Sequence, residues 1–210
     1  MFAPHPDDET LACGGTIALK VRDGEDVMVV VMTDGRKSHL YELGIQENPT
    51  PEELSIMRKK EAIEAAEVLG LRSDQVMFLG FGDRELGSQF EKARAKVTNI
   101  LETRKPSAVY FPSHEDVHPD HRATNIIVDN SLNHLKLPTK RFRYTIWRKN
   151  GSKLSSNHVT VDVSSMIEIK KRALEKYRSQ TSLISSRQTR PILDVQFIET
   201  FLKPNESFDV

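Results

Sequence analysis

Short apolar runs alternate with longer amphipathic stretches over the first two thirds of the chain. Residues 27–33, VMVVVMT, form a continuous β-branched run, the pattern of a strand that is buried on both faces. Similar runs predict strands at residues 75–79 and 107–111. A first strand at residues 1–3 is shorter than the usual strand of about five or six residues. The apolar pattern therefore predicts a sheet whose first strand is abbreviated.

Helical segments separate these predicted strands. Thr50, Pro51 and Glu53 form a capping box with proline in the first helical position, and Ser88 with Glu91 gives a similar helix-start signal. We expect helices over residues 16–21, 50–69, 88–104 and 119–132. Strands that alternate with helices through short connections predict an α/β fold, a doubly wound and mostly parallel sheet with helices on both faces.

The pattern changes in the last third of the chain. Residues 141–148 and 158–163 are strand-like and flank an Asn150-Gly151 turn, which favours an antiparallel addition to the sheet. Ser164 or Ser165 is predicted to begin a helix that reaches about residue 180. The remainder is polar and irregular, apart from a short helix expected over residues 195–202.

Composition limits the class of protein. The 210 residues suffice for one domain, 1–210, with a sizeable core. With 30 basic and 30 acidic residues the net charge is zero, which argues against a nucleic acid or an anionic membrane as partner. The single cysteine, Cys13, allows no intrachain disulfide, and no apolar run approaches the roughly 20 residues of a membrane span. We therefore predict a cytoplasmic protein, and the sequence leaves a homo-oligomer open.

Two polar clusters carry the candidate chemistry. HPDDE, residues 5–9, and SHEDVHPDH, residues 113–121, each follow a predicted strand and precede a predicted helix. Because the carboxyl ends of parallel strands meet at one edge of a sheet, the two clusters are expected to converge. His5 with Asp8, and His118 with His121, have the same three-residue spacing. Imidazole combined with carboxylate suits a borderline cation such as zinc.

Such a set of groups exceeds what one metal ion needs. Three protein ligands and one water suffice for a catalytic zinc, so the remaining groups are free for acid–base chemistry on an amide or ester. Each cluster alone would also fit a loop with an Asx turn or a helix cap. Gly14-Gly15 could cradle a phosphate, yet the chain contains neither GxGxxG nor GxxxxGK[ST]. Nucleotide binding is therefore weakly supported.

Taken together, the motifs resemble the PIG-L / LmbE-like family of zinc-dependent N-deacetylases. The matching segments are PHPDDE (4–9), GGT (14–16), TDG (33–35), RKKEAIEAAEVLG (58–70), FLGFGD (78–83), DVHPDHRAT (116–124) and YRSQ (177–180). They occur in the family's order and span nearly the whole chain. The resemblance implies a Rossmann-like sheet and an enzyme that hydrolyses an N-acetyl amide on an N-acetylglucosamine conjugate, releasing acetate.

The resemblance also implies residue roles. A zinc ion, or another divalent metal, would be bound by His5, Asp8 and His121. Asp7 would act as general base toward the metal-bound water, and His118, tuned by Asp120, would be the electrostatic stabiliser and acid. Arg58 resembles a family arginine that faces the substrate, although its helical spacing fits a solvated residue equally well.

The implied partner is a small N-acetylated sugar conjugate. Specificity is expected from residues 36–49, residues 82–87 and the segment after residue 180. Two alternatives stay open at this point, a catalytically inactive relative that binds amino sugars and a nucleotide-binding Rossmann-like protein. The abbreviated first strand puts the stability of the sheet edge that holds His5 in doubt.

Overall fold

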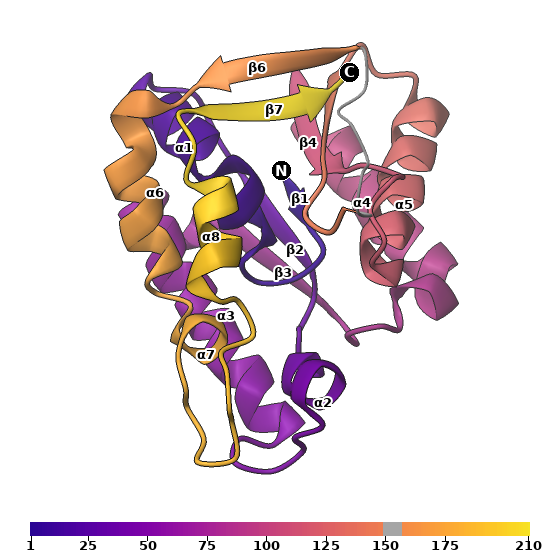
Figure 1. Ribbon diagram of the computed structural model, residues 1–210. Helices are drawn as coiled ribbons and strands as arrows, with labels where there is room; N and C mark the ends of the chain where they lie inside the picture. The colour runs from indigo at the N-terminus through magenta and orange to yellow at the C-terminus, as the bar shows by residue number, and fades with distance from the viewer. Residues whose placement is uncertain (149–156) are drawn as a thin grey trace.

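The computed structural model describes residues 1–148 and 157–210, in which the strands lie between two layers of helices (Figure 1). Three strands pair in parallel in the order β1-β2-β3, with bounds Phe2–Ala3, Val29–Thr33 and Val76–Phe81. Four more strands follow the order β4-β5-β7-β6, with bounds Ala108–Pro112, Lys140–Tyr144, Asn205–Asp209 and His158–Asp162. β5 is parallel to β4, whereas β7 is antiparallel to both β5 and β6.

The helices divide between the two faces. One layer contains α1 (Asp8–Arg22), α3 (Pro51–Val68), α6 (Ile167–Leu174) and α8 (Val195–Phe201). The other layer contains α4 (Phe90–Arg104) and α5 (Pro119–Leu135). Along β2, Val29 and Val31 pack into the first core while Val30 and Met32 pack into the second. The predicted α/β fold, with a β-branched strand buried on both faces, is confirmed.

Shorter elements connect these layers. They are α2 (Ser38–Leu43), α7 (Arg178–Thr181) and 3₁₀ turns at Ser73–Gln75, Leu86–Gln89 and Ser164–Met166. α2 was not predicted, because its six residues lie within a polar stretch. The predicted helix over residues 164–180 is instead split into the last 3₁₀ turn, α6 and α7.

The short first strand is stabilised from both sides. Phe2 and Ala3 pair with Val30 and Val31 of β2, and β1 also contacts β4. The Tyr144 hydroxyl donates a hydrogen bond of 2.9 Å to the Phe2 carbonyl. Because both residues of β1 are buried, the edge that holds His5 lies inside the fold.

The helix after the first motif begins earlier than the prediction of residues 16–21. α1 starts at Asp8, so Asp8 and Glu9 occupy its first turn, where negative charge is favourable. The glycine pair lies inside the helix, where another part of the chain approaches closely. A Cβ on Gly15 would lie only 2.6 Å from the Val163 Cβ. Gly14-Gly15 thus permits close packing on this helix, which accounts for the pair without a phosphate.

The late strands join the sheet in two ways: β6 is an antiparallel addition, as predicted, whereas β5 is parallel to β4. β7 separates β5 from β6, and the proposed Asn150-Gly151 turn lies outside the described residues. β7 escaped prediction because its sequence, NESFD, is mostly polar. Its buried Glu206 accepts a 2.6 Å contact from Lys170 Nζ and hydrogen bonds from the Gly15 and Thr16 N–H groups. Tertiary contacts, not an apolar pattern, position this strand.

Of the two helix-start signals at Thr50 and Ser88, the first is confirmed. The Thr50 hydroxyl accepts from the Glu53 N–H at 3.3 Å, and the Glu53 carboxylate accepts from the Thr50 N–H at 2.9 Å. The other prediction is wrong, since α4 begins at Phe90 after a 3₁₀ turn. There the Ser88 hydroxyl donates to the Glu85 carbonyl at 2.7 Å instead of capping the helix.

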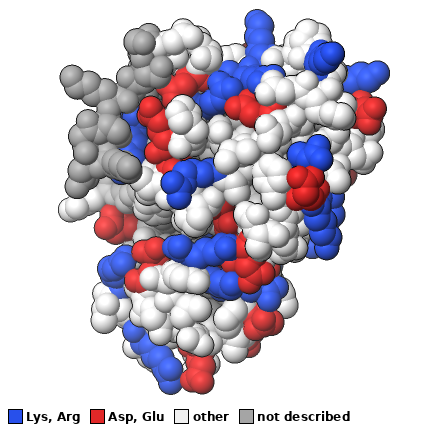
Figure 2. Space-filling view, turned by 90° about the vertical axis from the view of Figure 1, so that its right-hand side faces the viewer, with Lys and Arg blue, Asp and Glu red and all other residues white. Residues whose placement is uncertain are grey.

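The surface carries mixed charge. Figure 2 shows basic and acidic side chains interspersed over the face in view, without a large area of one sign. Within residues 1–148 and 157–210, no helix combines the length and the apolar character that crossing a membrane requires.

Candidate metal centre and active site

Two strand–helix junctions meet at the carboxyl edge of the sheet. The first, between β1 and α1, carries His5 and Asp8; the second, between β4 and α5, leads to His121 in the first turn of α5. Asp8 Oδ2 lies 3.1 Å from His5 Nδ1 and 3.1 Å from His121 Nε2. The two ring nitrogens are 3.3 Å apart. The structure thus brings together the three predicted ligands around one point.

The spacing of these three atoms fits a tetrahedral ion. Bonds of about 2.0–2.1 Å in tetrahedral geometry place neighbouring ligand atoms about 3.3 Å apart. His5, Asp8 and His121 are 7%, 2% and 0% exposed, so the site is shielded from bulk water. Two imidazoles and one carboxylate form a donor set that zinc accepts, with a further position left for water.

Each imidazole presents its other nitrogen to a carboxylate. His121 Nδ1 lies 2.9 Å from Asp116 Oδ2, and His5 Nε2 lies 3.3 Å from Asp120 Oδ2 and 3.4 Å from Asp83 Oδ1. Such contacts fix the orientation and tautomer of metal-binding histidines. Asp116 Oδ2 also accepts the backbone N–H groups of Ile146 and Trp147. The sequence analysis did not single out Asp116, because these partners depend on the tertiary fold.

Among the described residues, two other groups of possible metal ligands also include His5. The nitrogens of His5, His118 and His121 lie within 4.8 Å of one another, as do ligand atoms of His5, Asp83 and Asp120. In the second group, Asp120 Oδ2 already accepts the Arg84 N–H at 2.6 Å. Asp83 Oδ2 likewise accepts the Lys37 N–H at 2.9 Å. Asp8 Oδ2 also accepts a backbone N–H, that of His5 at 2.9 Å, so backbone donors do not separate the sets. The set with Asp8 is favoured because its three atoms lie within 3.3 Å of one another and combine two imidazoles with one carboxylate, which suits zinc.

The electrostatics also fit a cation. Burial alone lowers the pKa of His121, but Asp8 and Asp116 outweigh it and raise that pKa to about 9. Burial also lowers the pKa of His5, but the contacts with Asp120, Asp8 and Asp83 outweigh burial and raise that pKa well above its usual value. The carboxylates here thus attract positive charge strongly. Because metal ligands must be deprotonated, a divalent ion would replace these protons.

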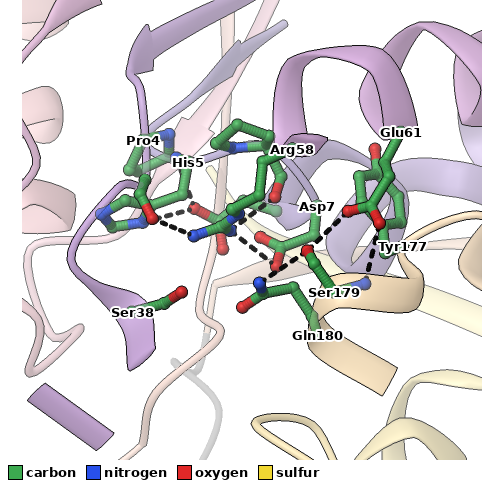
Figure 3. Close-up of polar contacts among 12 residues, drawn as sticks. Pro4, His5, Asp7, Ser38, Arg58, Glu61, Tyr177, Ser179 and Gln180 are labelled. Carbon is green, nitrogen blue, oxygen red and sulfur yellow. Dashed lines mark hydrogen bonds and ion pairs between the residues drawn. The ribbon is translucent and has the colours of Figure 1, made fainter. Parts of the chain in front are cut away.

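Asp7 lies beside this centre in an uncommon backbone conformation. It is the N-cap of α1 and has a φ of 126°, and its N–H donates to Glu9 Oε2 at 3.2 Å. Arg58 Nη2 lies 2.9 Å from Asp7 Oδ2 and donates to the Pro6 carbonyl at 2.6 Å. Figure 3 shows Arg58 beside Asp7. Burial raises the pKa of Asp7 to about 7, against the opposing effect of Arg58. A carboxyl with this pKa can exchange a proton near neutral pH.

Arg58 is not a solvated residue. It is 2% exposed, and its Nη1 donates to the Gly35 carbonyl at 2.8 Å while Nη2 serves Asp7 and Pro6. A Cβ on Gly35 would lie 2.3 Å from Arg58 Nη1, so only glycine leaves room for the guanidinium. The observed contacts orient Asp7, and direct substrate binding by Arg58 stays a prediction.

His118 and Asp120 differ from the sequence-based expectation. His118 is the N-cap of α5, and its Nδ1 accepts the Asp120 N–H at 3.2 Å, which leaves the hydrogen of the neutral ring on Nε2. Burial, followed by the neighbouring His5 and His121, lowers the pKa of His118 to about 3. The resting ring is thus neutral, not protonated. Asp120 contacts the His118 ring through its backbone, because its carboxylate is turned toward His5 and the Arg84 N–H.

A second polar network joins α3 to α7. Glu61 accepts the Ser179 N–H at 2.8 Å and its hydroxyl at 2.6 Å, and Gln180 Nε2 donates to Ser179 Oγ at 2.9 Å (Figure 3). The Tyr177 hydroxyl donates to Glu9, whose other oxygen holds the Asp7 N–H. The YRSQ segment is therefore part of the support for Asp7, and sequence spacing gave no sign of its partners.

A cavity of about 350 Å³ opens onto these residues. Its floor, as we use the term, consists of His5, Asp7, Asp8, Arg58 and Asp83, which are all buried. Its mouth consists of Lys37, Tyr41, Glu42, Arg84, Val117 and Trp147, which are partly or fully exposed. Gln180, Ile192 and Leu193 also line it. All three segments predicted to set specificity thus contribute to the cavity wall.

Comparison with known proteins agrees with this geometry. Residues 1–132 match the PIG-L family, described as GlcNAc-PI de-N-acetylase. The chain belongs to this family. The family description and the similar proteins name deacetylases, enzymes that hydrolyse amides, so the predicted family and enzyme class are confirmed.

Similar proteins cover most of the chain. It is 30% identical to a probable N-acetyl-alpha-D-glucosaminyl L-malate deacetylase 2 of Bacillus cereus, over 85% of this chain and 81% of that protein. It is 28% identical to a diacetylchitobiose deacetylase of Thermococcus kodakarensis, over 84% of this chain and 67% of that protein. Among solved structures, the N,N'-diacetylchitobiose deacetylase of Pyrococcus horikoshii has a TM-score of 0.73 and 26% identity, covering 99% and 80% of the two chains.

Proposed function

We propose that the protein is a zinc-dependent N-deacetylase that hydrolyses the N-acetyl amide of an N-acetylglucosamine conjugate and releases acetate. The observation that carries the proposal is the contact of Asp8 Oδ2 with both His5 Nδ1 and His121 Nε2 at 3.1 Å. A base, Asp7, and a neutral imidazole, His118, face the same cavity.

His5, Asp8 and His121 would hold the ion. When bound, zinc supplies Lewis-acid chemistry, which activates water and polarises an acyl carbonyl. Asp7 accepts the proton of the attacking water, and its pKa of about 7 suits that task. Arg58 holds the Asp7 carboxylate in place through the 2.9 Å ion pair.

His118 stabilises the developing oxyanion as a hydrogen-bond donor. Its Nδ1 is occupied by the Asp120 N–H, so the ring hydrogen is on Nε2 and available to the substrate. From the sequence, His118 is expected to act as an acid. In this proposal the His118 ring is neutral, because its pKa is low. The proton that Asp7 has taken is then the one returned to the departing amine.

The sugar conjugate is supported by the relatives and by the size of the cavity. The similar proteins act on N-acetylglucosamine joined to malate or to a second sugar, according to their names. The volume of about 350 Å³ falls within the range of small-molecule sites, roughly 300–1,000 Å³. Polar groups on the floor and both aromatic and charged groups at the mouth suit a polar ligand.

An acetate-release assay tests the proposal. Metal-free and zinc-loaded protein are incubated with N-acetylglucosaminyl malate, N-acetylglucosamine 1-phosphate and diacetylchitobiose, and acetate is quantified. We expect zinc-dependent release that a chelator abolishes. Conjugate binding without acetate release would instead indicate an inactive amino-sugar-binding protein, and nucleotide binding alone would indicate the nucleotide-binding alternative.

A further inference from the structure

Two basic side chains belong to the cavity mouth, and they differ in their partners. Lys37 Nζ lies 2.7 Å from Glu85 Oε1, which compensates its charge. The acidic residue of the mouth, Glu42, lies 3.9 Å from Arg190 Nη2. Arg84 has no carboxylate within 4.0 Å of its guanidinium among the described residues. The mouth therefore has one basic group whose charge is not paired.

The placement of Arg84 leaves its hydrogen-bond donors available. Its guanidinium carbon lies 4.0 Å from the centre of the Tyr41 ring, so the ring contacts one face of the guanidinium. The five N–H donors of arginine point outward in the guanidinium plane, in a fork that matches carboxylate or phosphate oxygens. A stacked arginine is thus stiffened for binding an anion at its edge.

The backbone of Arg84 is tied to the catalytic floor. The residue has a positive φ of 63°, and its N–H donates to Asp120 Oδ2 at 2.6 Å. That same oxygen lies 3.3 Å from His5 Nε2. The Arg84 side chain and His5 line one continuous cavity. One carboxylate, that of Asp120, thus contacts both the Arg84 backbone and the His5 ring.

We propose that the conjugate bears an anionic group on the unit attached to its amino sugar, and that Arg84 binds this anion as the specificity-determining residue. The inference rests on the proposed function, which makes the floor the place of the N-acetyl group. The shared chemistry is a carboxylate or a phosphate, since both accept the arginine fork.

A comparison of three conjugates tests the inference. Zinc-loaded protein is assayed for kcat/KM with N-acetylglucosaminyl malate, N-acetylglucosamine 1-phosphate and the neutral diacetylchitobiose. Arg84→Gln should lower kcat/KM for the preferred anionic conjugate about 10–100-fold, mainly through KM, because a charge-assisted contact is lost. It should change the value for the neutral conjugate by no more than about twofold. Whichever anionic conjugate loses more identifies the carboxylate or the phosphate as the group bound.

Arg94→Gln is the matched control. Arg94 pairs with Glu91 on α4 outside the cavity, so the variant removes the same charge without touching the mouth. Its effect should be below about twofold on every conjugate. An equal loss for anionic and neutral conjugates in Arg84→Gln, or a parent protein without preference for anions, would overturn the inference.

Calorimetric binding of the same three conjugates to zinc-loaded Asp7→Asn protein, with and without Arg84→Gln, separates the two proposals. Anion-dependent binding that needs Arg84, without turnover by the parent protein, would refute the deacetylase and uphold the anion site. Turnover by the parent that does not depend on Arg84 would uphold the deacetylase and refute the anion site. If neither binding nor turnover depends on the anion, the inference is wrong.

Discussion

The floor and the mouth of the same cavity are built in different ways. On the floor, His5 and Asp8 are 7% and 2% exposed, and each polar group is fixed by partners from another element. At the mouth, Tyr41 and Val117 are 54% and 41% exposed, and the contacts are surface ion pairs and one stacked arginine. The floor is thus suited to precise chemistry. The mouth is joined to the carboxylates around His5 through backbone N–H groups, of Lys37 to Asp83 and of Arg84 to Asp120, so its side chains can change while those contacts are kept.

The helix that carries part of the mouth, α2, is also less buried than the floor. α2 carries Lys37 at its N-cap and Tyr41 in its middle, yet it buries a single residue, His39. No hydrogen-bond partner of His39 Nε2 is found within residues 1–148 and 157–210. One neutral imidazole therefore anchors this side of the mouth.

The largest effect is expected on the floor. Asp7→Asn keeps the shape of the side chain but removes the base, so kcat for acetate release should fall about 10²–10⁴-fold for every conjugate. The zinc content, measured by atomic absorption, should stay at the parent level because Asp7 is not among the three proposed ligands. Asp129→Asn is the control and should retain full activity, because Asp129 does not line the cavity and pairs with Arg141 and Arg143. Turnover by Asp7→Asn near the parent value would show that Asp7 is not the general base.

A second prediction concerns the anchor of α2. Burial, followed by Arg58, lowers the pKa of His39 from 6.5 to about 4 in the folded protein. The unfolded chain binds this proton near pH 6.5 and the folded protein only near pH 4, so stability falls as the pH drops through this window. By pH 4 the loss attributable to His39 should reach about 3 kcal/mol.

Chemical unfolding measured from pH 7 to pH 4 checks this prediction. His39→Gln should lose less stability than the parent protein over that range, because its side chain does not titrate. His134→Gln removes an exposed histidine on α5 and should follow the parent curve. Parallel pH curves for the parent and His39→Gln would show that the anchor does not act through its charge.

The smallest effect is expected from the residue that orients His121. Asp116→Asn weakens the 2.9 Å contact with His121 Nδ1 while keeping an acceptor oxygen. Zinc affinity, measured by competition with a chromogenic chelator, should fall about 10–100-fold. Thermal unfolding of the metal-free variant checks that it is still folded. The Asp129→Asn protein is again the control and should bind zinc like the parent. Unchanged affinity in a folded variant would leave Asp116 without a role in the metal centre.

The floor could be predicted from sequence to a large extent because its groups are local. His5 and Asp8 are separated by one turn, and His121 lies in the first turn of a helix that follows a recognisable buried strand. The edge of a parallel sheet then brings the two segments together, so the 3.1 Å contact of Asp8 with His121 follows from topology. Thr50 and Glu53 were predictable for the same reason, since a capping box involves only neighbours.

Residues whose function depends on distant partners could not be predicted. Tyr177 contacts Glu9 across 168 positions, and the two N–H donors that share Asp116 Oδ2 with His121 come from residues 30 and 31 positions away. β7 is fixed by the burial of Glu206, a residue that an apolar pattern treats as exposed. The lowered pKa of His118 likewise follows from its burial and then from the proximity of two other imidazoles, neither of which a spacing rule contains.

The position of bound zinc is the measurement that tests the account most directly. Crystals of zinc-loaded protein, with anomalous diffraction recorded on both sides of the zinc absorption edge, should give one peak about 2.0–2.2 Å from His5 Nδ1, Asp8 Oδ2 and His121 Nε2. A peak on the opposite side of the His5 ring, bound by Nε2 with Asp83 and Asp120, would contradict the account, as would a fully loaded protein with no ion within reach of Asp8.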